Sequence, residues 1–182
     1  MSERFATNVE IGGDIPRSLI ASLAEAIQSA GLGLEWGDTS STKDLRKALL
    51  GCDGKSTLHV KATELAGGNI DPLDKYCVSH GIAFTKRVDG KCEYNGVIHW
   101  WHPGLSGIQE WHDTDKQANL VMLQRETLEE ALQKGKTLEQ VTQRLREIAP
   151  QVPNIQITSK TKKAKQPDPL LPKVEAFDPF EL

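Results

Sequence analysis

Hydrophobic and polar residues alternate in several short stretches of the first half of the chain. In residues 5–11 the predicted inner side carries Thr7, Val9 and Ile11, and in residues 57–65 it carries Leu58, Val60 and Ala62. A period of two residues is typical of a β-strand with one buried face. The pattern therefore predicts a strand over each stretch.

A β-hairpin is predicted after residue 81. Residues 82–88 predict a strand, and the Asp89-Gly90 dipeptide that follows is favoured in two-residue hairpin turns. The chain is then expected to return as a strand over residues 91–101, interrupted or bulged at Asn95-Gly96.

Three other stretches repeat their apolar residues every three or four positions, which is the period of a helix with one buried side. They cover residues 14–30, 42–50 and 71–80. Pro16 lies in the first turn of the first predicted helix, and Gly31 follows its last residue. Both positions are the ones that these residue types favour at helix ends.

Two more helices are predicted in the C-terminal half, over residues 113–135 and 137–149. Thr137 and Gln140 have the spacing of a capping box, in which each side chain bonds the backbone N–H of the other residue. A short turn between two helices predicts a helical hairpin.

The predicted elements follow one another as strand, two helices, strand, helix, two strands and a helical hairpin. This mixture predicts an α+β fold, and a small ferredoxin-like (split βαβ) sheet layer is the first choice. We expect an α+β domain over residues 1–112, the helical hairpin over 113–149 and a proline-rich flexible tail over 150–182. Six of the nine prolines lie in this tail.

Composition narrows the class of protein. The chain has 182 residues, 38% of them hydrophobic, and a net charge of −3. A folded core is expected, and a clearly basic nucleic-acid coat protein is excluded. The sequence has no long apolar span and no apolar N-terminal leader, so we expect neither a membrane span nor secretion. Three cysteines make no disulfide framework, which favours a cytoplasmic location.

Cysteine and histidine residues cluster in one region and comprise Cys77, His80, Cys92, His99 and His102. Such a cluster suggests a zinc site and leaves a metal-dependent enzyme open as an alternative. The expected geometry opposes this site, because Cys77 and His80 lie on the buried side of a helix. Residues three apart on a strand, such as His99 and His102, point to opposite faces. We therefore predict no metal and no other cofactor, and we assign no catalytic residue.

The segment from His99 to His102 holds two adjacent tryptophans. Neighbouring residues of a strand point to opposite faces, so we predict that Trp100 is core and that Trp101 is the more exposed ring. The exposed ring would lie near Lys86, Arg87 and Tyr94. Aromatic and basic residues on a sheet are typical of protein interfaces and of single-stranded nucleic-acid sites. If helices cover both rings, both are core.

The tail has a basic part followed by an apolar and acidic part. Residues 159–166 contain no acid and four lysines, Lys160, Lys162, Lys163 and Lys165, which would suit nucleic acid. Residues 167–182 contain four acids and one lysine. Their spaced hydrophobic residues are typical of a linear peptide that docks in a partner groove, with Phe177, Phe180 and Leu182 as its anchors. A solvated tail is the alternative.

Three short motifs follow one another between residues 76 and 104. They are Tyr76-Cys77-Val78-Ser79-His80-Gly81-Ile82-Ala83-Phe84, Asp89-Gly90-Lys91-Cys92-Glu93-Tyr94 and Pro103-Gly104. Together they resemble small uncharacterised proteins of bacterial genomes, plasmids and phages. The resemblance implies a helix–strand–hairpin unit and a bacterial or mobile-element origin, and it brings no activity with it.

These observations favour a non-enzymatic cytoplasmic binding or adaptor protein that docks another macromolecule, with a protein as the expected partner. If a phage or plasmid encodes the chain, a host system is the expected target. Two alternatives stay open, a metal-dependent enzyme that uses the Cys/His cluster and a nucleic-acid-binding protein that uses the tryptophan-containing sheet and the lysine-rich segment. No membrane partner is expected.

Overall fold

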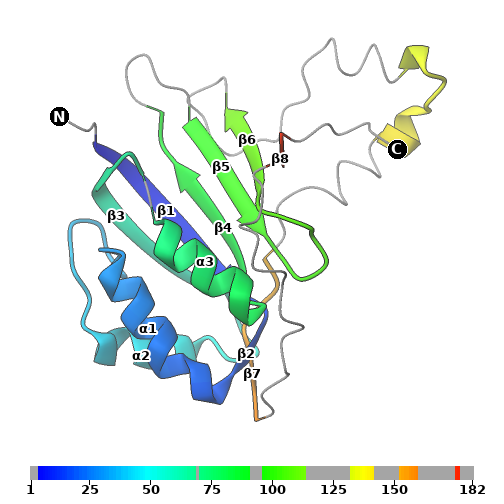
Figure 1. Cartoon of the computed structure of the whole chain (residues 1–182). Helices are drawn as coiled ribbons and strands as arrows, with labels where there is room; N and C mark the ends of the chain where they lie inside the picture. The colour runs from blue at the N-terminus through cyan, green and yellow to red at the C-terminus, as the bar shows by residue number, and fades with distance from the viewer. Residues whose placement is uncertain are drawn as a thin grey trace.

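The computed structural model describes residues 4–68, 70–90, 96–113, 132–141, 152–159 and 175–176. Its centre is a six-stranded sheet in the order β3-β1-β4-β5-β6-β8 (Figure 1). The antiparallel part consists of β1 (Arg4–Gly12), β3 (Leu58–Ala66), β4 (Ala83–Val88), β5 (Gly96–Trp101) and β6 (Gln109–Asp113). The short strand β8 (Glu175–Ala176) pairs in parallel with the outer edge of β6.

Helices cover one face of this sheet. They are α1 (Ile20–Ser29), preceded by the 3-10 turn η1 (Arg17–Leu19), α2 (Thr42–Gly51) and α3 (Asp71–His80). Figure 1 shows them in front of β3, β1 and β4, whereas β5 and β6 lie beyond α3. The Ser41 hydroxyl accepts the Asp44 N–H at the start of α2, and Gly81 ends α3 with a φ of 72°. In the described part of the chain no helix is long and apolar enough to cross a membrane.

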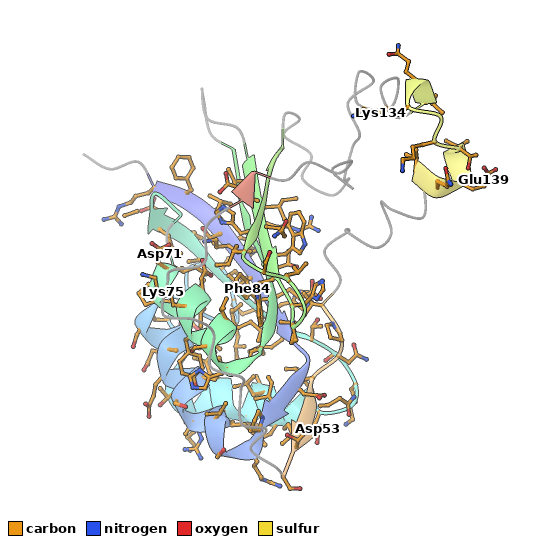
Figure 2. All side chains as sticks on the ribbon, turned by 45° about the vertical axis from the view of Figure 1, so that its right-hand side comes forward. Asp53, Asp71, Lys75, Phe84, Lys134 and Glu139 are labelled. Carbon is orange, nitrogen blue, oxygen red and sulfur yellow. The ribbon has the colours of Figure 1, made fainter. Side chains whose placement is uncertain are left out.

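The hydrophobic core lies between the sheet and these helices. The predicted inward positions of β1 and β3 are all buried, and Phe84 of β4 continues the same layer (Figure 2). The helices contribute Ile20, Leu23, Ala24, Ile27, Leu45, Leu49, Leu73 and Cys77. The mixture of helices and strands that the periodicity predicts is confirmed.

The ferredoxin-like topology is not confirmed. That fold interleaves two split βαβ units, whereas here β3, α3 and β4 form one such unit around β1, and β5 and β6 follow as neighbours. The first departure from that fold is the pairing of β1 with β3, which are adjacent and antiparallel. The connection through two helices returns the chain to the end of the sheet where β1 finishes, so Ile11 lies opposite Leu58.

Part of the predicted tail belongs to the folded unit. We name residues 152–158 the strap; within it, β7 (Gln156–Thr158) pairs in parallel with β2 (Asp14–Pro16), as Figure 1 shows. Ile155 is 0% exposed and belongs to the core. The prediction that residues 150–182 stay outside the compact core is therefore wrong for the strap, because a short extended segment docks despite its prolines.

The strap bonds through backbone groups to β2 and to Gly13, the residue between β1 and β2. Gly13 donates its N–H to the Pro153 carbonyl at 2.9 Å and accepts the Gln156 N–H at 3.0 Å. A Cβ atom at Gly12 would lie 2.0 Å from the Pro153 oxygen, so only glycine fits there without displacing the strap. Residues 14–16, which the sequence predicts to start a helix, instead form the paired strand β2. Helical turns begin only at Arg17.

The other side of the strap bonds to the turn before β3. The Ile155 N–H donates to the Ser56 carbonyl at 3.0 Å, and the Ile155 carbonyl accepts the Gly54 N–H at 2.8 Å. The Asp53 carboxylate accepts the Ile157 N–H at 2.8 Å, and Figure 2 shows Asp53 beside this strand. The strap is thus bonded on both sides, like an internal strand.

The predicted helical hairpin is not confirmed, and most of it lies outside the described residues. Its start differs, because Asp113 belongs to β6, a strand that the sequence did not predict. The predicted capping box is present: the Thr137 N–H donates to the Gln140 side chain at 2.9 Å, and the Gln140 N–H donates to the Thr137 hydroxyl at 3.3 Å. The predicted strand over 91–101 is described from Gly96 onward, as β5.

Candidate functional site

Trp100 and Trp101 lie on opposite faces of the sheet, as alternation predicts. Trp101 is opposite Phe84 and belongs to the core under the helices, whereas Trp100 is opposite Thr85 on the other face. The two rings are 4% and 8% exposed, respectively. Trp101 is the more exposed ring, as predicted, but only slightly, because both rings are buried. The expectation that Trp100 is the ring on the helix side is wrong, since Trp101 occupies that side. The reason is that the face shared by Val97, His99 and Trp101 is the one that faces the helices.

The other residues predicted to bind a partner are placed differently from one another. Lys86 is 3% exposed and points to the helix side, so the expectation that it flanks an exposed ring is wrong. Arg87 is partly exposed on the opposite face. The remaining predicted residues, Tyr94, Phe177, Phe180, Leu182, Lys160, Lys162, Lys163 and Lys165, lie outside the described residues.

Four ionisable side chains form a line across the helix side of the sheet. Lys86 of β4 is opposite His99 of β5, and His99 is opposite Glu110 of β6. Residues that are opposite in neighbouring strands share a face and lie side by side. Asp74 of α3 bonds Lys86 from above. We name these four residues the polar row; it runs from the core to the edge of the sheet.

The inner half of the polar row is a buried ion pair. The Lys86 Nζ atom lies 2.6 Å from the Asp74 Oδ2 atom, and the two side chains are 4% and 7% exposed. Burial raises the pKa of the Asp74 carboxyl, and the Lys86 ammonium opposes this increase. The Asp74 Oδ1 atom is buried and has no hydrogen-bond partner among the described residues. Each charge therefore depends on the other for compensation.

The outer half of the polar row is more exposed. The His99 Nε2 atom lies 2.7 Å from the Glu110 Oε2 atom, and the side chains are 21% and 26% exposed. Burial and the nearby Lys86 ammonium lower the pKa of His99, although the bond to Glu110 acts in the opposite direction. At neutral pH the imidazole is uncharged, and its Nε2–H donates to the Glu110 carboxylate.

The charge of the polar row differs between its two halves. Lys86 compensates Asp74 at 2.6 Å, whereas burial and the Lys86 ammonium lower the pKa of His99 and favour its neutral ring. An uncharged imidazole held by a carboxylate can also accept a proton, which is the arrangement of a general base. The nearby Cys77 thiol is no partner for such chemistry, because burial in the core raises its pKa.

The Cys/His cluster of the sequence is not brought together. Cys77 lies in the core, and His80 stacks on Tyr76 with 4.2 Å between ring centroids. His99 belongs to the polar row, and His102 contacts the Pro103 carbonyl. Cys92 lies outside the described residues. Within the described ranges no three His, Cys, Asp or Glu side chains are grouped so that they can hold a metal ion.

The outer edge of β6 pairs with a strand from the end of the chain. Gln109 is opposite Glu175, and Glu110 is opposite Ala176, in parallel orientation. Glu110 therefore belongs both to the polar row and to the strand that receives β8. We name the outer edge of residues 109–113 the β6 edge. The polar row and the β6 edge together form the candidate functional site.

Sequence reasoning missed most of this site. Asp74 lies one helical turn before the buried Cys77, which is a signal that it faces the core. Lys86 alternates with the buried Phe84, which places it on the same inward face. Because both residues are charged, the sequence favours exposed positions for them. Their burial is explained by the ion pair that they form between α3 and β4.

The chain was compared with protein families, with curated proteins and with solved structures, and none of them matches it. Its function is therefore to be inferred from the polar row and the β6 edge.

Proposed function

We propose that this chain is a non-enzymatic, cytoplasmic binding protein that docks an extended segment of another protein on the β6 edge. The observation that supports this most is the parallel pairing of β6 with Glu175–Ala176. An edge strand that pairs with a distant segment of its own chain has the backbone groups needed to pair with a segment of another chain.

The described pairing between β8 and β6 is short. Among the described residues, two pairs join β8 to β6, whereas six join β1 to β4. Pairing of this length is marginal without side-chain packing. Fifteen residues, 160–174, separate β8 from Ser159, the residue that follows the strap, so the connecting chain is long enough to let β8 leave the edge. A longer partner strand can therefore replace it.

The two other functions that the sequence left open receive less support. A metal-dependent enzyme would need the Cys/His residues close together, whereas the described ones have separate surroundings: Cys77 lies in the core, and His80, His99 and His102 each contact a different residue. A nucleic-acid site on the sheet would need an exposed ring near Lys86, whereas Trp100, Trp101 and Lys86 are buried. A host target remains the expected one if a phage or plasmid encodes the chain.

The proposal is tested by removing β8 from the edge without shortening the chain. Adjacent residues of a strand point their N–H groups in opposite directions, so the double change Glu175→Pro and Ala176→Pro removes whichever N–H group faces β6. The variant and the original chain are each panned against a library of displayed decapeptides. Selected peptides are then cross-linked to locate their site.

We expect the double proline variant to retain more peptides than the original chain, with cross-links to residues 109–113. The control is the double change Lys162→Pro and Lys163→Pro, which adds the same prolines to the tail outside β8. It should behave like the original chain. Equal retention by all three proteins, or cross-links confined to other strands, would show that the β6 edge is not a docking site.

A further inference from the structure

Three polar side chains meet on the face of the sheet that the helices do not cover. Glu10 of β1 lies on this face, because it alternates with the buried residues Val9 and Ile11. His59 of β3 is opposite Glu10, and Thr57 lies two residues before His59, just ahead of β3. We name Glu10, Thr57 and His59 the Glu10 cluster. None of the three belongs to the Cys/His cluster of the sequence.

The polar atoms of the Glu10 cluster surround one point. The Thr57 hydroxyl donates to the Glu10 Oε1 atom at 2.7 Å, and its oxygen lies 3.2 Å from the His59 Nε2 atom. The same Nε2 and Oε1 atoms are 3.9 Å apart. A point equidistant from these three atoms lies about 2 Å from each, and bonds from Zn²⁺ to nitrogen and oxygen ligands are about 2.0–2.2 Å long. An ion at this point contacts all three atoms with the side chains where they lie.

The donor atoms of the Glu10 cluster suit a transition-metal ion. Imidazole nitrogen and carboxylate oxygen are both ligands of Zn²⁺. The third donor is a hydroxyl oxygen, so the site is not a group of three His, Cys, Asp or Glu side chains, of which the described ranges contain none. The Thr57 hydroxyl can rotate so that a lone pair faces the ion. The side chains of His59 and Glu10 are 57% and 35% exposed, which leaves room for water as a further ligand.

A buried hydroxyl beside the Glu10 cluster also points to a ligand. Thr85 of β4 is opposite Glu10, on the side away from His59, and is 4% exposed. Its Oγ1 atom is buried and has no hydrogen-bond partner among the described residues. Side chains at opposite positions of two strands are about 5 Å apart at their Cβ atoms. A water molecule bound to an ion at Glu10 can therefore donate a hydrogen bond to Thr85.

We propose that the Glu10 cluster binds a divalent transition-metal ion, with Zn²⁺ as the expected ion. The ion joins β1 to the turn that holds the strap, because Ser56, the neighbour of Thr57, accepts the Ile155 N–H at 3.0 Å. The inference goes beyond the proposed function and does not depend on it, since no residue of the Glu10 cluster belongs to β6 or β8.

The test uses the full-length chain, treated with a chelator and then titrated with Zn²⁺ in a calorimeter. We expect about one equivalent to bind at the tightest site, and Mg²⁺ at the same concentrations to bind much more weakly, because it prefers oxygen ligands. Backbone amide signals followed by NMR locate the ion. The largest shifts on addition of Zn²⁺ should lie at residues 10, 57–59 and 85.

Three variants assign the site to its side chains. Glu10→Gln keeps an oxygen that accepts the Thr57 hydroxyl, and His59→Gln keeps a polar side chain. Each should weaken Zn²⁺ binding by at least about tenfold, since even partners outside the first ligand shell cost this much. Thr57→Val should weaken it less, because water can replace a hydroxyl.

The matched controls are Glu64→Gln and His102→Gln, which change the same residue types outside the Glu10 cluster. Glu64 pairs with Arg4, and His102 contacts the Pro103 carbonyl, so Zn²⁺ binding should be unchanged in both variants. The inference is overturned if the original chain binds no Zn²⁺, if Glu10→Gln and His59→Gln bind it as tightly as the controls, or if the shifts centre on residues 77–112. Circular dichroism checks that each variant folds, and Thr57→Val still tests the site if one of the others does not.

Discussion

Two segments of the C-terminal part of the chain pair with strands of the first 113 residues, the strap with β2 and β8 with β6, and they are held in different ways. The strap is bonded on both sides, by Gly13 and by the turn around Ser56, and it buries Ile155 completely. In the part of the chain that the structure describes, β8 pairs with β6 over two residues. Both segments are extended, and both come from the proline-rich tail of the sequence.

The difference separates a structural segment from an exchangeable one. An apolar side chain in the core and hydrogen bonds on two sides make the strap costly to remove. A short pairing at an open edge costs little to undo, which suits a site where strands exchange. The polar row shows the same gradient, from the buried pair of Asp74 and Lys86 to the partly exposed pair of His99 and Glu110.

A substitution in the strap should cause the largest loss of stability. Ile155→Ala removes a fully buried side chain and leaves a cavity next to the core, so the free energy of unfolding should fall by about 4 kcal/mol. Urea unfolding followed by circular dichroism measures this. Gln156→Ala, at an exposed strap position, is the matched control and should change stability by less than about 0.5 kcal/mol. Similar small losses for both would show that the strap is not part of the core.

The buried ion pair should give the next largest effect. Lys86→Met keeps the length of the side chain but leaves the Asp74 carboxylate buried without its cation, so we expect a loss of about 3 kcal/mol. Changing Asp74→Leu in the same protein should restore most of the stability, because no unpaired charge is then buried. If the double variant is as unstable as Lys86→Met alone, the loss arises from packing instead of from the charge.

The sequence predicts the parts of this structure that local periodicity specifies. The strands β1, β3 and β4 and the helices α2 and α3 alternate or repeat clearly, and they lie close to where the pattern places them. The strap and β6 carry no such pattern. The strap depends on glycines at positions 12 and 13, more than 130 residues away in sequence, and β6 is a polar strand defined by its pairing with β5.

The candidate site shows where residue type and periodicity disagree. Alternation places Lys86 on the same face as Phe84, whereas a lysine by itself argues for solvent. The structure resolves the conflict in favour of alternation, because Asp74 supplies a counter-charge from α3. For Trp100 and Trp101 alternation correctly places the rings on opposite faces, but it does not say which face the helices cover or that both rings are buried.

The outer pair of the polar row should make stability depend on pH. The folded-state pKa of His99 is lowered, so its contribution to stability is complete above the unfolded pKa of about 6.5 and is lost as pH falls through the lower folded pKa. The pKa of Asp74 is raised in the folded state, so Asp74 has the opposite effect: its contribution to stability decreases as pH rises from its ordinary pKa of 3.8. Between pH 7 and pH 5 the free energy of unfolding should therefore fall less in His99→Gln than in the original chain. Parallel pH profiles for the two proteins would contradict this assignment.

The smallest effect on global stability is expected for β8, and this completes the contrast with the strap. The double change Glu175→Pro and Ala176→Pro breaks the pairing with β6, but two residue pairs at an edge contribute little to the folded unit. The free energy of unfolding should change by less than about 0.5 kcal/mol. In the strap, Gln156→Pro removes the N–H that bonds the Gly13 carbonyl at 3.0 Å, inside a segment bonded on both sides, and should cost about 3 kcal/mol. Urea unfolding of the two variants under the same conditions compares them directly. An equal loss in both would mean that β8 is as integral to the fold as the strap, and that the β6 edge is closed to exchange.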